Sequence, residues 1–281
     1  MTNTVTFIEC DKTYEEAKTV IFGAPFDGTV SYRPGTRFAP DQIRIDSANI
    51  ESYSPYLDKD LKDYSIADIG DVDVYFGNKF KTLDSIYECT KKIVDASKIP
   101  FMFGGEHLVT YPAVKAVFEK YPNLKIIHID AHTDLRDTFF GEELSHATVL
   151  KRVHDLVGDH NIYQFGIRSG LKKEFDFAKE HFYIEPLTVN TLPDIASTLN
   201  NTPIYLTLDL DVLDPSIMMG TGTPEAGGIT YKELMHGLYA LSNLNIVGLD
   251  VVELSPHYDP SGVSTAIASK IIRELLLIVN K

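Results

Sequence analysis

The sequence contains few cysteines and no long apolar run. Its 281 residues include only Cys10 and Cys89, which are far apart and lack C-x-x-C spacing. Neither a disulfide framework nor a thiolate zinc site is expected, and a reducing cytoplasm is the natural location. No apolar stretch approaches the roughly 18 residues that span a bilayer, and the acidic N-terminal segment lacks the apolar core of a secretory signal. These absences predict a soluble cytoplasmic protein with no membrane partner.

Positive charge is also scarce. The chain has 26 lysines and arginines against 40 aspartates and glutamates, which gives a net charge of -14. This balance argues against a nucleic-acid partner, because little positive charge is available to neutralise phosphates. It suits a cationic ligand or a metal ion, although negative charge also simply keeps proteins soluble.

No linker or internal repeat divides the chain, so we expect a single domain over residues 1–281. Short apolar runs end in Gly or Asp, and segments with an apolar period near 3.6 separate most of them. Continuous apolar strands that alternate with helices are typical of a parallel sheet covered on both faces, which makes the predicted class α/β. The predicted strands are 19–25, 64–71, 99–105, 124–130, 162–168, 203–211 and 245–254.

Acidic and histidine residues gather where three of these runs end. The segments are "GGEH" (104–107), "DAHTD" (130–134) and "DLDVLDP" (209–215). Parallel sheets bind ligands beyond the carboxyl ends of their strands, and alternate residues of an extended segment point the same way. We therefore expect six side chains to converge: His107, Asp130, His132, Asp134, Asp209 and Asp211.

Four carboxylates at one point would repel each other unless a cation lies among them. Two divalent ions would balance the four charges, and ligation that is mainly by oxygen favours manganese over zinc or copper. For any one segment, the alternative is that a strand-end Asp caps a helix or forms a turn. Three such segments at three strand ends are difficult to explain as caps, so a two-metal site is the preferred hypothesis.

These segments resemble the signatures of the ureohydrolase family of arginases and agmatinases. The family pattern is Gly-Gly-[Asp/Glu]-His, Asp-Ala-His-x-Asp and Asp-x-Asp-x-x-Asp-Pro, and all three occur here in order. The resemblance covers almost the whole chain, and the segments "RPG...IR" (within 23–44) and "VVELSPHYD" (251–259) are similar to agmatinases in particular. It implies a three-layer α/β/α sandwich around a mostly parallel eight-stranded sheet. It also implies two Mn²⁺ ions with a bridging hydroxide that hydrolyses a guanidinium to urea and an amine.

The resemblance implies a role for each ligand. Asp130 and Asp209 would each bridge the two ions. His107 and Asp134 would complete one site, while His132 and Asp211 would complete the other. Asp134 would also orient the hydroxide toward the guanidinium carbon.

Three further residues match catalytic or substrate-binding positions of the family. His146 would transfer a proton to the leaving amine, Glu253 would pair with the substrate guanidinium, and Thr223 would line the same pocket. Each has an alternative. His146 could start a helix behind Ser145 as N-cap, Glu253 could face solvent at a strand end, and Thr223 could shape its Gly-rich turn.

The loop that follows "DAHTD" bears on the substrate. It carries three acidic residues: Asp137, Glu142 and Glu143. Negative charge near a pocket mouth favours a substrate that ends in an ammonium, such as agmatine. Arg136 in the same loop could instead meet a carboxylate. Phe139 and Phe140 could line the aliphatic part of the substrate or pack within the loop.

The leading hypothesis is therefore a manganese-dependent agmatinase that converts a small cationic guanidine to putrescine and urea. Arginase, guanidinobutyrase and formiminoglutamase activities on the same centre are alternatives. A non-catalytic binder of metal or polyamine is a further alternative. By analogy with the family, we expect a homo-oligomer, either a trimer or a hexamer.

Overall fold

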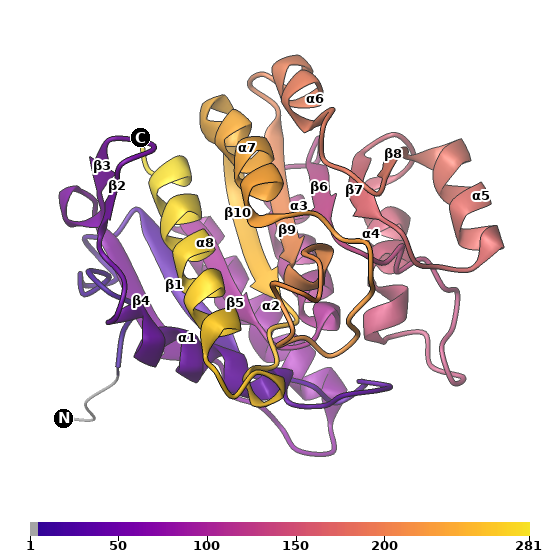
Figure 1. The fold of residues 1–281 in the computed structure, drawn as a ribbon, viewed down its shortest axis with the longest axis horizontal. Helices are drawn as coiled ribbons and strands as arrows, with labels where there is room; N and C mark the ends of the chain where they lie inside the picture. Colours follow the sequence, from indigo (N-terminus) through magenta and orange to yellow (C-terminus); the bar gives the residue numbers. More distant parts are fainter. Residues whose placement is uncertain (1–4) are drawn as a thin grey trace.

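The computed structural model describes residues 5–281, in which an eight-stranded sheet lies between two layers of helices (Figure 1). The strand order is β4-β1-β5-β10-β9-β6-β7-β8, and all neighbouring strands are parallel. The predicted sandwich is thus confirmed. The strands are β1 (Thr19–Ala24), β4 (Ile66–Asp71), β5 (Ile99–Gly104), β6 (Lys125–Ile129), β7 (Ile162–Ile167), β8 (Tyr183–Pro186), β9 (Pro203–Asp209) and β10 (Asn245–Val252); a small antiparallel pair is formed by β2 (Tyr53–Ser54) and β3 (Lys59–Asp60).

Four helices cover each face of the sheet. One layer is drawn toward the viewer in Figure 1 and contains α1 (Ala39–Ser47), α6 (Leu192–Thr198), α7 (Tyr231–Ala240) and α8 (Val263–Val279). The other layer contains α2 (Lys79–Asp95), α3 (Thr110–Lys120), α4 (Val149–Val157) and α5 (Lys172–His181). Each layer packs its apolar residues against one face of the strands, so the strands are apolar along almost their whole length, as a sheet buried on both faces requires.

The sequence pattern predicted seven of the eight strands and missed β8. This strand has only four residues, lies at the edge of the sheet, and contains Glu185. The Glu185 carboxylate accepts main-chain N–H bonds from Asn190 and Thr191 at 2.8 and 3.0 Å. An acidic residue is tolerated in this edge strand because the following loop supplies the two N–H donors. The sequence of the strand itself does not indicate that such donors follow.

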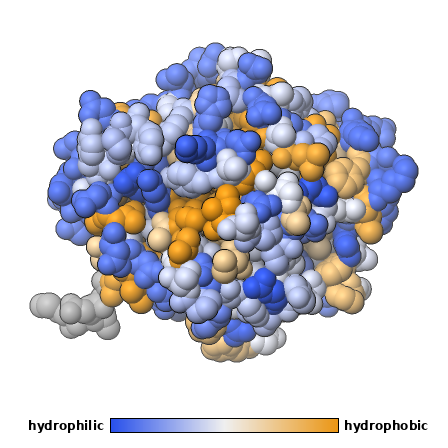
Figure 2. All heavy atoms as spheres, in the orientation of Figure 1, coloured by the Kyte–Doolittle hydropathy of each residue, from blue (hydrophilic) through white to orange (hydrophobic). Residues whose placement is uncertain are grey.

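The face of the molecule shown in Figure 2 is mainly hydrophilic. On the face shown in Figure 2, hydrophobic residues form a band across the middle, over α7 and α8, with hydrophilic residues around it. Within residues 5–281, no helix combines the length and the apolar character needed to cross a membrane.

The strand order places four functional segments side by side. The strands β5, β10, β9 and β6 are consecutive neighbours at the centre of the sheet. Their carboxyl ends lead to His107, Glu253, Asp209 and Asp130, in that order across the sheet. Residues 146 positions apart in the chain, His107 and Glu253, therefore meet at one edge, as the general rule for open parallel sheets leads one to expect.

Candidate metal centre and active site

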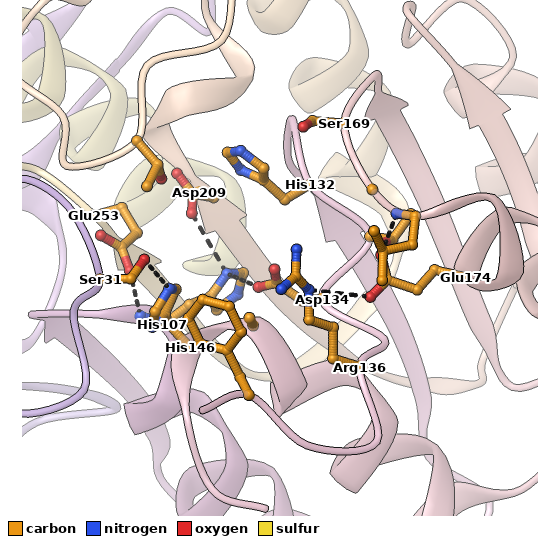
Figure 3. Close-up of a pocket in the computed structure, with 16 residues that line it drawn as sticks. Ser31, His107, His132, Asp134, Arg136, His146, Ser169, Glu174, Asp209 and Glu253 are labelled. Carbon is orange, nitrogen blue, oxygen red and sulfur yellow. Dashed lines mark hydrogen bonds and ion pairs between the residues drawn. The ribbon is translucent and has the colours of Figure 1, made fainter. Parts of the chain in front are cut away.

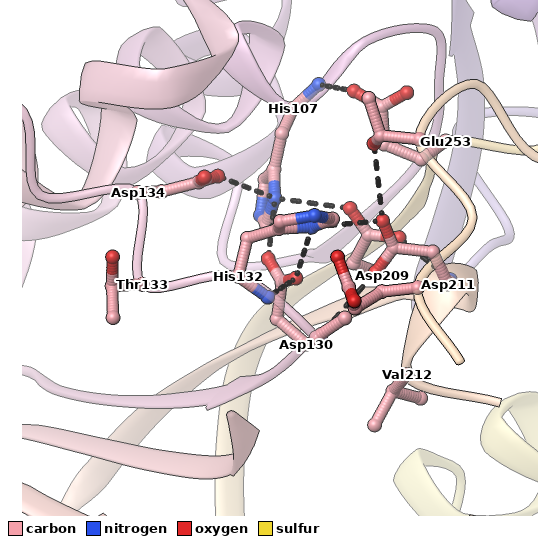
Figure 4. A network of polar contacts seen from close by, with 12 residues as sticks. His107, Asp130, His132, Thr133, Asp134, Asp209, Asp211, Val212 and Glu253 are labelled. Atoms are coloured by element: carbon pink, nitrogen blue, oxygen red, sulfur yellow. Dashed lines mark hydrogen bonds and ion pairs between the residues drawn. The ribbon is translucent and has the colours of Figure 1, made fainter. Parts of the chain in front are cut away.

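All six of the residues proposed as metal ligands meet at this edge of the sheet (Figure 4). The Nδ1 atom of His107 lies 3.1 Å from Asp130 Oδ2 and 3.3 Å from Asp134 Oδ2. It also lies 3.4 Å from Oδ2 of Asp209. One imidazole nitrogen is therefore surrounded by three carboxylate oxygens.

A second group adjoins the first. His132 Nδ1 lies 3.0 Å from Asp211 Oδ2 and 3.5 Å from Asp130 Oδ1. The two oxygens of Asp130 thus face different histidines, and Asp130 belongs to both groups. One ligand atom from each of His107, His128, Asp130 and Asp134 lies within 4.8 Å of the others, and the same holds for Asp130, His132 and Asp211. Two such groups with a shared carboxylate could hold a pair of ions.

The surroundings of His107 favour a cation at this place. Its Nε2 atom is 2.9 Å from the hydroxyl of Thr207, and that hydroxyl donates to Asp250 Oδ1 at 2.6 Å. Since the hydroxyl proton points to Asp250, the hydroxyl oxygen accepts the Nε2 proton of a neutral His107. Nδ1 then presents a lone pair to three carboxylates, and it has no hydrogen-bond partner among the described residues. Only a positive charge, either a proton or a metal ion, makes this arrangement favourable.

The electrostatics agree with the geometry. Burial and the neighbouring Asp211 and Asp130 raise the pKa of Asp209 well above its usual value. The carboxylates raise the pKa values of His107 and His132 well above the usual value of histidine, although burial acts in the opposite direction. In the absence of metal, protons are thus held where cations would bind. The donor set of carboxylates and imidazoles therefore fits divalent metal ions.

Short turns orient the carboxylates. Asp130 Oδ1 accepts the main-chain N–H of His132 at 2.6 Å, and Asp209 Oδ1 accepts that of Asp211 at 2.7 Å. Asp209 is also the N-cap of the 3-10 turn Leu210–Val212. The capping alternative therefore describes Asp209 correctly, but only for one of its oxygens, since the other faces His107.

His128 contacts the candidate ligand Asp130, and the sequence pattern did not predict this contact. His128 is fully buried, and its Nε2 lies 2.8 Å from Asp130 Oδ2. The Gln164 amide donates to His128 Nδ1 at 3.1 Å and to the Thr133 carbonyl at 2.9 Å, so the His128 proton lies on Nε2 and is donated to Asp130. His128 thus orients a ligand and is not one itself. The signal in the sequence was a histidine inside an apolar run, two positions before Asp130.

A cavity of about 270 Å³ opens beside the cluster (Figure 3). Glu253, His146 and Thr223 all line it. Glu253 is 5% exposed, so the solvent-facing alternative is wrong. The Thr223 hydroxyl donates to Asp211 Oδ2 at 3.3 Å, which connects the Gly-rich turn to the metal-ligand cluster.

Glu253 is held by the segment that carries His107. Its Oε1 accepts the main-chain N–H of His107 at 2.7 Å, and its own N–H donates to the Gly105 carbonyl at 2.9 Å. Burial, with Glu106 nearby, raises the pKa of Glu253 well above its usual value. Glu253 has φ of 67° and Asp134 has φ of 53°. Left-handed backbone at two non-glycine residues is strain of about 1–3 kcal/mol each, which is typical of functional sites.

His146 begins the 3-10 turn His146–Thr148 behind Ser145 as N-cap, so the helix-start alternative describes its backbone, and it also lines the cavity. Its Nε2 lies 3.2 Å from the Ser31 hydroxyl, and burial lowers its pKa. The main-chain N–H of His146 donates to the Thr29 hydroxyl at 3.1 Å, and Thr29 in turn donates to the fully buried Glu106. Glu106 therefore positions the segment that holds His146, a role that its sequence context did not reveal.

The three acidic side chains of the loop after "DAHTD" do not line this cavity, although Arg136 of the same loop does. The prediction that Asp137, Glu142 and Glu143 lie at the substrate pocket was therefore wrong. Glu142 pairs with Lys79, and Asp137 lies 3.5 Å from Lys173. Phe139 lines the cavity and packs edge-on against His146, whereas Phe140 is 87% exposed.

A different carboxylate faces the cavity. Glu174, in the first turn of α5, is 3% exposed and lines the pocket. Its Oε2 accepts from the Thr133 hydroxyl at 2.9 Å and from the Leu171 N–H at 2.6 Å. Its Oε1 has no hydrogen-bond partner among the described residues and lies 3.4 Å from Arg136 Nε. Figure 3 shows Glu174 and Arg136 on one side of His132 and Asp134, with Glu253 on the other side.

Fold and site together define a parallel α/β protein with a cluster of potential metal ligands beside a cavity. The model of the Arginase family matches residues 17–278. The chain is 51% identical to an agmatinase of Bacillus cereus over 96% of this chain and 95% of that protein, and 49% identical to an agmatinase of Bacillus subtilis with the same coverage. A crystal structure of a putative agmatinase from Clostridium difficile superposes with a TM-score of 0.94 at 54% identity, covering 95% of this chain and 98% of that one. The chain belongs to the arginase family.

Proposed function

We propose that this protein is an agmatinase, which hydrolyses agmatine to putrescine and urea. The chain is 51% and 49% identical to two bacterial agmatinases over 96% of its length, which supports this activity. The observation that carries the proposal is the buried carboxylate of Glu253 beside a cluster of four aspartates and two histidines. A guanidinium pairs well with a carboxylate, and a cluster of this composition is suited to divalent ions. We also propose that residues 1–281 act as one catalytic unit, since strands from both halves of the sheet contribute to the cluster.

The cluster would hold two divalent cations, and the oxygen-rich set favours manganese. His107 and Asp134 would bind one ion, His132 and Asp211 the other, and Asp130 and Asp209 would contact both. When bound, such a pair lowers the pKa of water and so supplies a nucleophile near neutral pH.

Three residues would act on the substrate and the proton. Glu253 would hold the guanidinium through the oxygen that does not accept the His107 N–H, and the cationic substrate would favour the ionised form of this carboxylate. Asp134 would orient the attacking water by accepting a hydrogen bond. Burial lowers the pKa of His146, which favours its neutral form, so it would accept the proton that the attacking water releases and deliver it to the leaving amine. The products, urea and a protonated diamine, then leave through the cavity mouth.

The tail of the substrate would point toward Glu174. The Oε1 atom of this buried carboxylate lies 3.4 Å from Arg136 Nε but accepts no hydrogen bond from any described residue, and a substrate ammonium would donate one to it. Arg136, held over the Phe139 ring at 4.6 Å, would turn away from Glu174 when the ammonium arrives. A carboxylate on the substrate would instead lie beside Glu174 and be repelled, which supports agmatine over arginine.

The first test is urea release from agmatine and from arginine by the manganese-loaded protein. We expect kcat/KM for agmatine to exceed that for arginine at least 100-fold. Arginine as the better substrate would indicate an arginase. No urea from any guanidine, with manganese still bound, would indicate a non-catalytic binder.

The second test separates the two ends of the substrate. The Glu174→Gln variant keeps the shape of the side chain but loses its charge. We expect it to raise KM for agmatine about 10- to 100-fold, the effect of one charge-assisted hydrogen bond, and to leave 1-butylguanidine unaffected because it has no ammonium. A Glu143→Gln control in the acidic loop should change neither. Equal losses on both substrates in the Glu174 variant would show that Glu174 only caps α5.

A further inference from the structure

Two histidines and an aspartate meet at a second place, between the C-terminal ends of α4 and α5, and none of the three lines the cavity. His154 Nε2 lies 2.7 Å from Asp159 Oδ1, and His181 Nδ1 lies 2.8 Å from the same oxygen. The three atoms lie within 4.8 Å of one another. Two imidazole nitrogens and a carboxylate are ligands that zinc commonly uses, with further positions open to water.

The chain brings these side chains together without an ion. His154 is in the last turn of α4, and His181 is the last residue of α5. The Gly158 that ends α4 has φ of 77°, which turns the chain so that Asp159 lies between the two imidazoles. The main-chain N–H of His160 then donates to the His181 carbonyl at 2.7 Å and fixes this turn to the end of α5. Little rearrangement is required to bind an ion, which reduces the entropy lost on binding.

The other ring nitrogens also have suitable neighbours. His154 Nδ1 is buried, has no hydrogen-bond partner among the described residues, and lies 3.9 Å from Asp155. His181 Nε2 lies 4.0 Å from Glu180. Metal-bound imidazoles commonly direct their second N–H to a carboxylate, which raises their basicity. Phe177 packs against both imidazoles, with ring centroids 5.1 Å from His154 and 4.2 Å from His181.

We propose that His154, Asp159 and His181 form a peripheral binding site for a divalent transition-metal ion, specifically Zn²⁺. Two nitrogens and one oxygen suit zinc, whereas the oxygen-rich cluster at the sheet edge suits manganese. The Asp159 side chain is 53% exposed, so a water ligand and an entering ion both have access. A bound ion would join the C-terminal ends of α4 and α5, the two helices whose N-terminal ends adjoin His146 and carry Glu174.

The test counts ions and does not depend on activity. Protein loaded with manganese is dialysed against low zinc in the presence of excess manganese, and both metals are measured by mass spectrometry. We expect the unmodified chain to retain one zinc per chain more than the Asp159→Asn and His181→Gln variants, with equal manganese in all three. The matched control is His160→Asn, since His160 is exposed, has φ of 59°, and adjoins the site without contributing a ligand atom to it.

Two further measurements distinguish a built site from loose surface binding. With Co²⁺ in place of zinc, we expect the unmodified chain and the control to show the visible absorption of Co²⁺ bound by a small number of nitrogen and oxygen ligands. The two variants should not show it. Zinc is expected to raise the unfolding temperature of the chain and not that of Asp159→Asn. Equal zinc in all four proteins would overturn the proposal. Zinc uptake matched by an equal loss of manganese would also overturn it, because the zinc would then occupy the central cluster.

Discussion

The contact between the Thr207 hydroxyl and His107 gives a test of how this chain orients the imidazole of a candidate metal ligand. Replacing Thr207 with Val keeps the shape of a fully buried side chain and removes only its hydroxyl. The Nε2 proton of His107 then loses its acceptor, and Asp250 Oδ1 loses its donor. Asp250 Oδ2 keeps the Tyr205 hydroxyl at 2.7 Å, so the main deficit lies on His107.

The magnitudes follow from these contacts. A buried polar group without a partner costs about 1–3 kcal/mol, so we expect Thr207→Val to lower the free energy of unfolding by about that amount. Loss of a partner that orients a metal-bound imidazole typically weakens metal affinity about 10- to 100-fold. Val at position 207 is therefore expected to weaken manganese binding by that factor while the protein stays folded.

The assay is a manganese titration followed by calorimetry, beside urea unfolding of the metal-free protein followed by circular dichroism, since the chain has no tryptophan. Thr110→Val is the matched control. The Thr110 hydroxyl is buried and lies 3.4 Å from that of Thr207, but makes no hydrogen bond to His107. A Thr207 variant that loses stability yet binds manganese as tightly as the control would refute the idea that this hydroxyl sets the His107 tautomer.

Three other outcomes are expected. Glu253→Gln should retain its manganese, measured by metal analysis, and lose about 10- to 100-fold in kcat/KM, as expected when a charged pair becomes a neutral one; full metal loss would contradict its role. Asp209→Asn should lose manganese and urea release together, and activity without metal loss would count against Asp209 as a ligand. Metal removal should destabilise the protein more as pH rises above about 6.5, where free histidine loses its proton. The raised pKa values of His107 and His132 stabilise the metal-free fold below that pH, and this contribution is lost as pH rises through them. The difference in unfolding temperature between loaded and metal-free protein should therefore widen, and a constant difference from pH 6 to 9 would oppose this account.

Much of the candidate site could be predicted because its residues follow strand ends. Period-two spacing in "DAHTD" and the polar residues after apolar runs identify ligands without knowledge of the strand order. The residues that orient them were harder to find. His128, Thr207 and Asp250 lie inside strands, where a buried polar residue signals a partner but does not say which one.

The part of the cavity that Glu174 lines could not be predicted in this way. Three acidic residues in the loop after "DAHTD" were the natural choice for an ammonium, but their side chains lie outside the cavity, and Lys79 and Lys173 lie beside two of them. Glu174 comes from a different loop and helix, and a capping position in α5 gave no indication that its second oxygen would face the cavity.

By itself, the sequence determined the α/β class, seven strands of the main sheet, and six residues suited to bind metal, because these depend on apolar periodicity and on which residues follow a strand. Only the tertiary structure decided that β10 lies between β5 and β9, which brings Glu253 next to His107. It also decided that the carboxylate of Glu174 lines the cavity, while those of Asp137, Glu142 and Glu143 do not. Neighbour relations in a parallel sheet arise from long-range packing of helices on its two faces, and no local pattern in the chain encodes them.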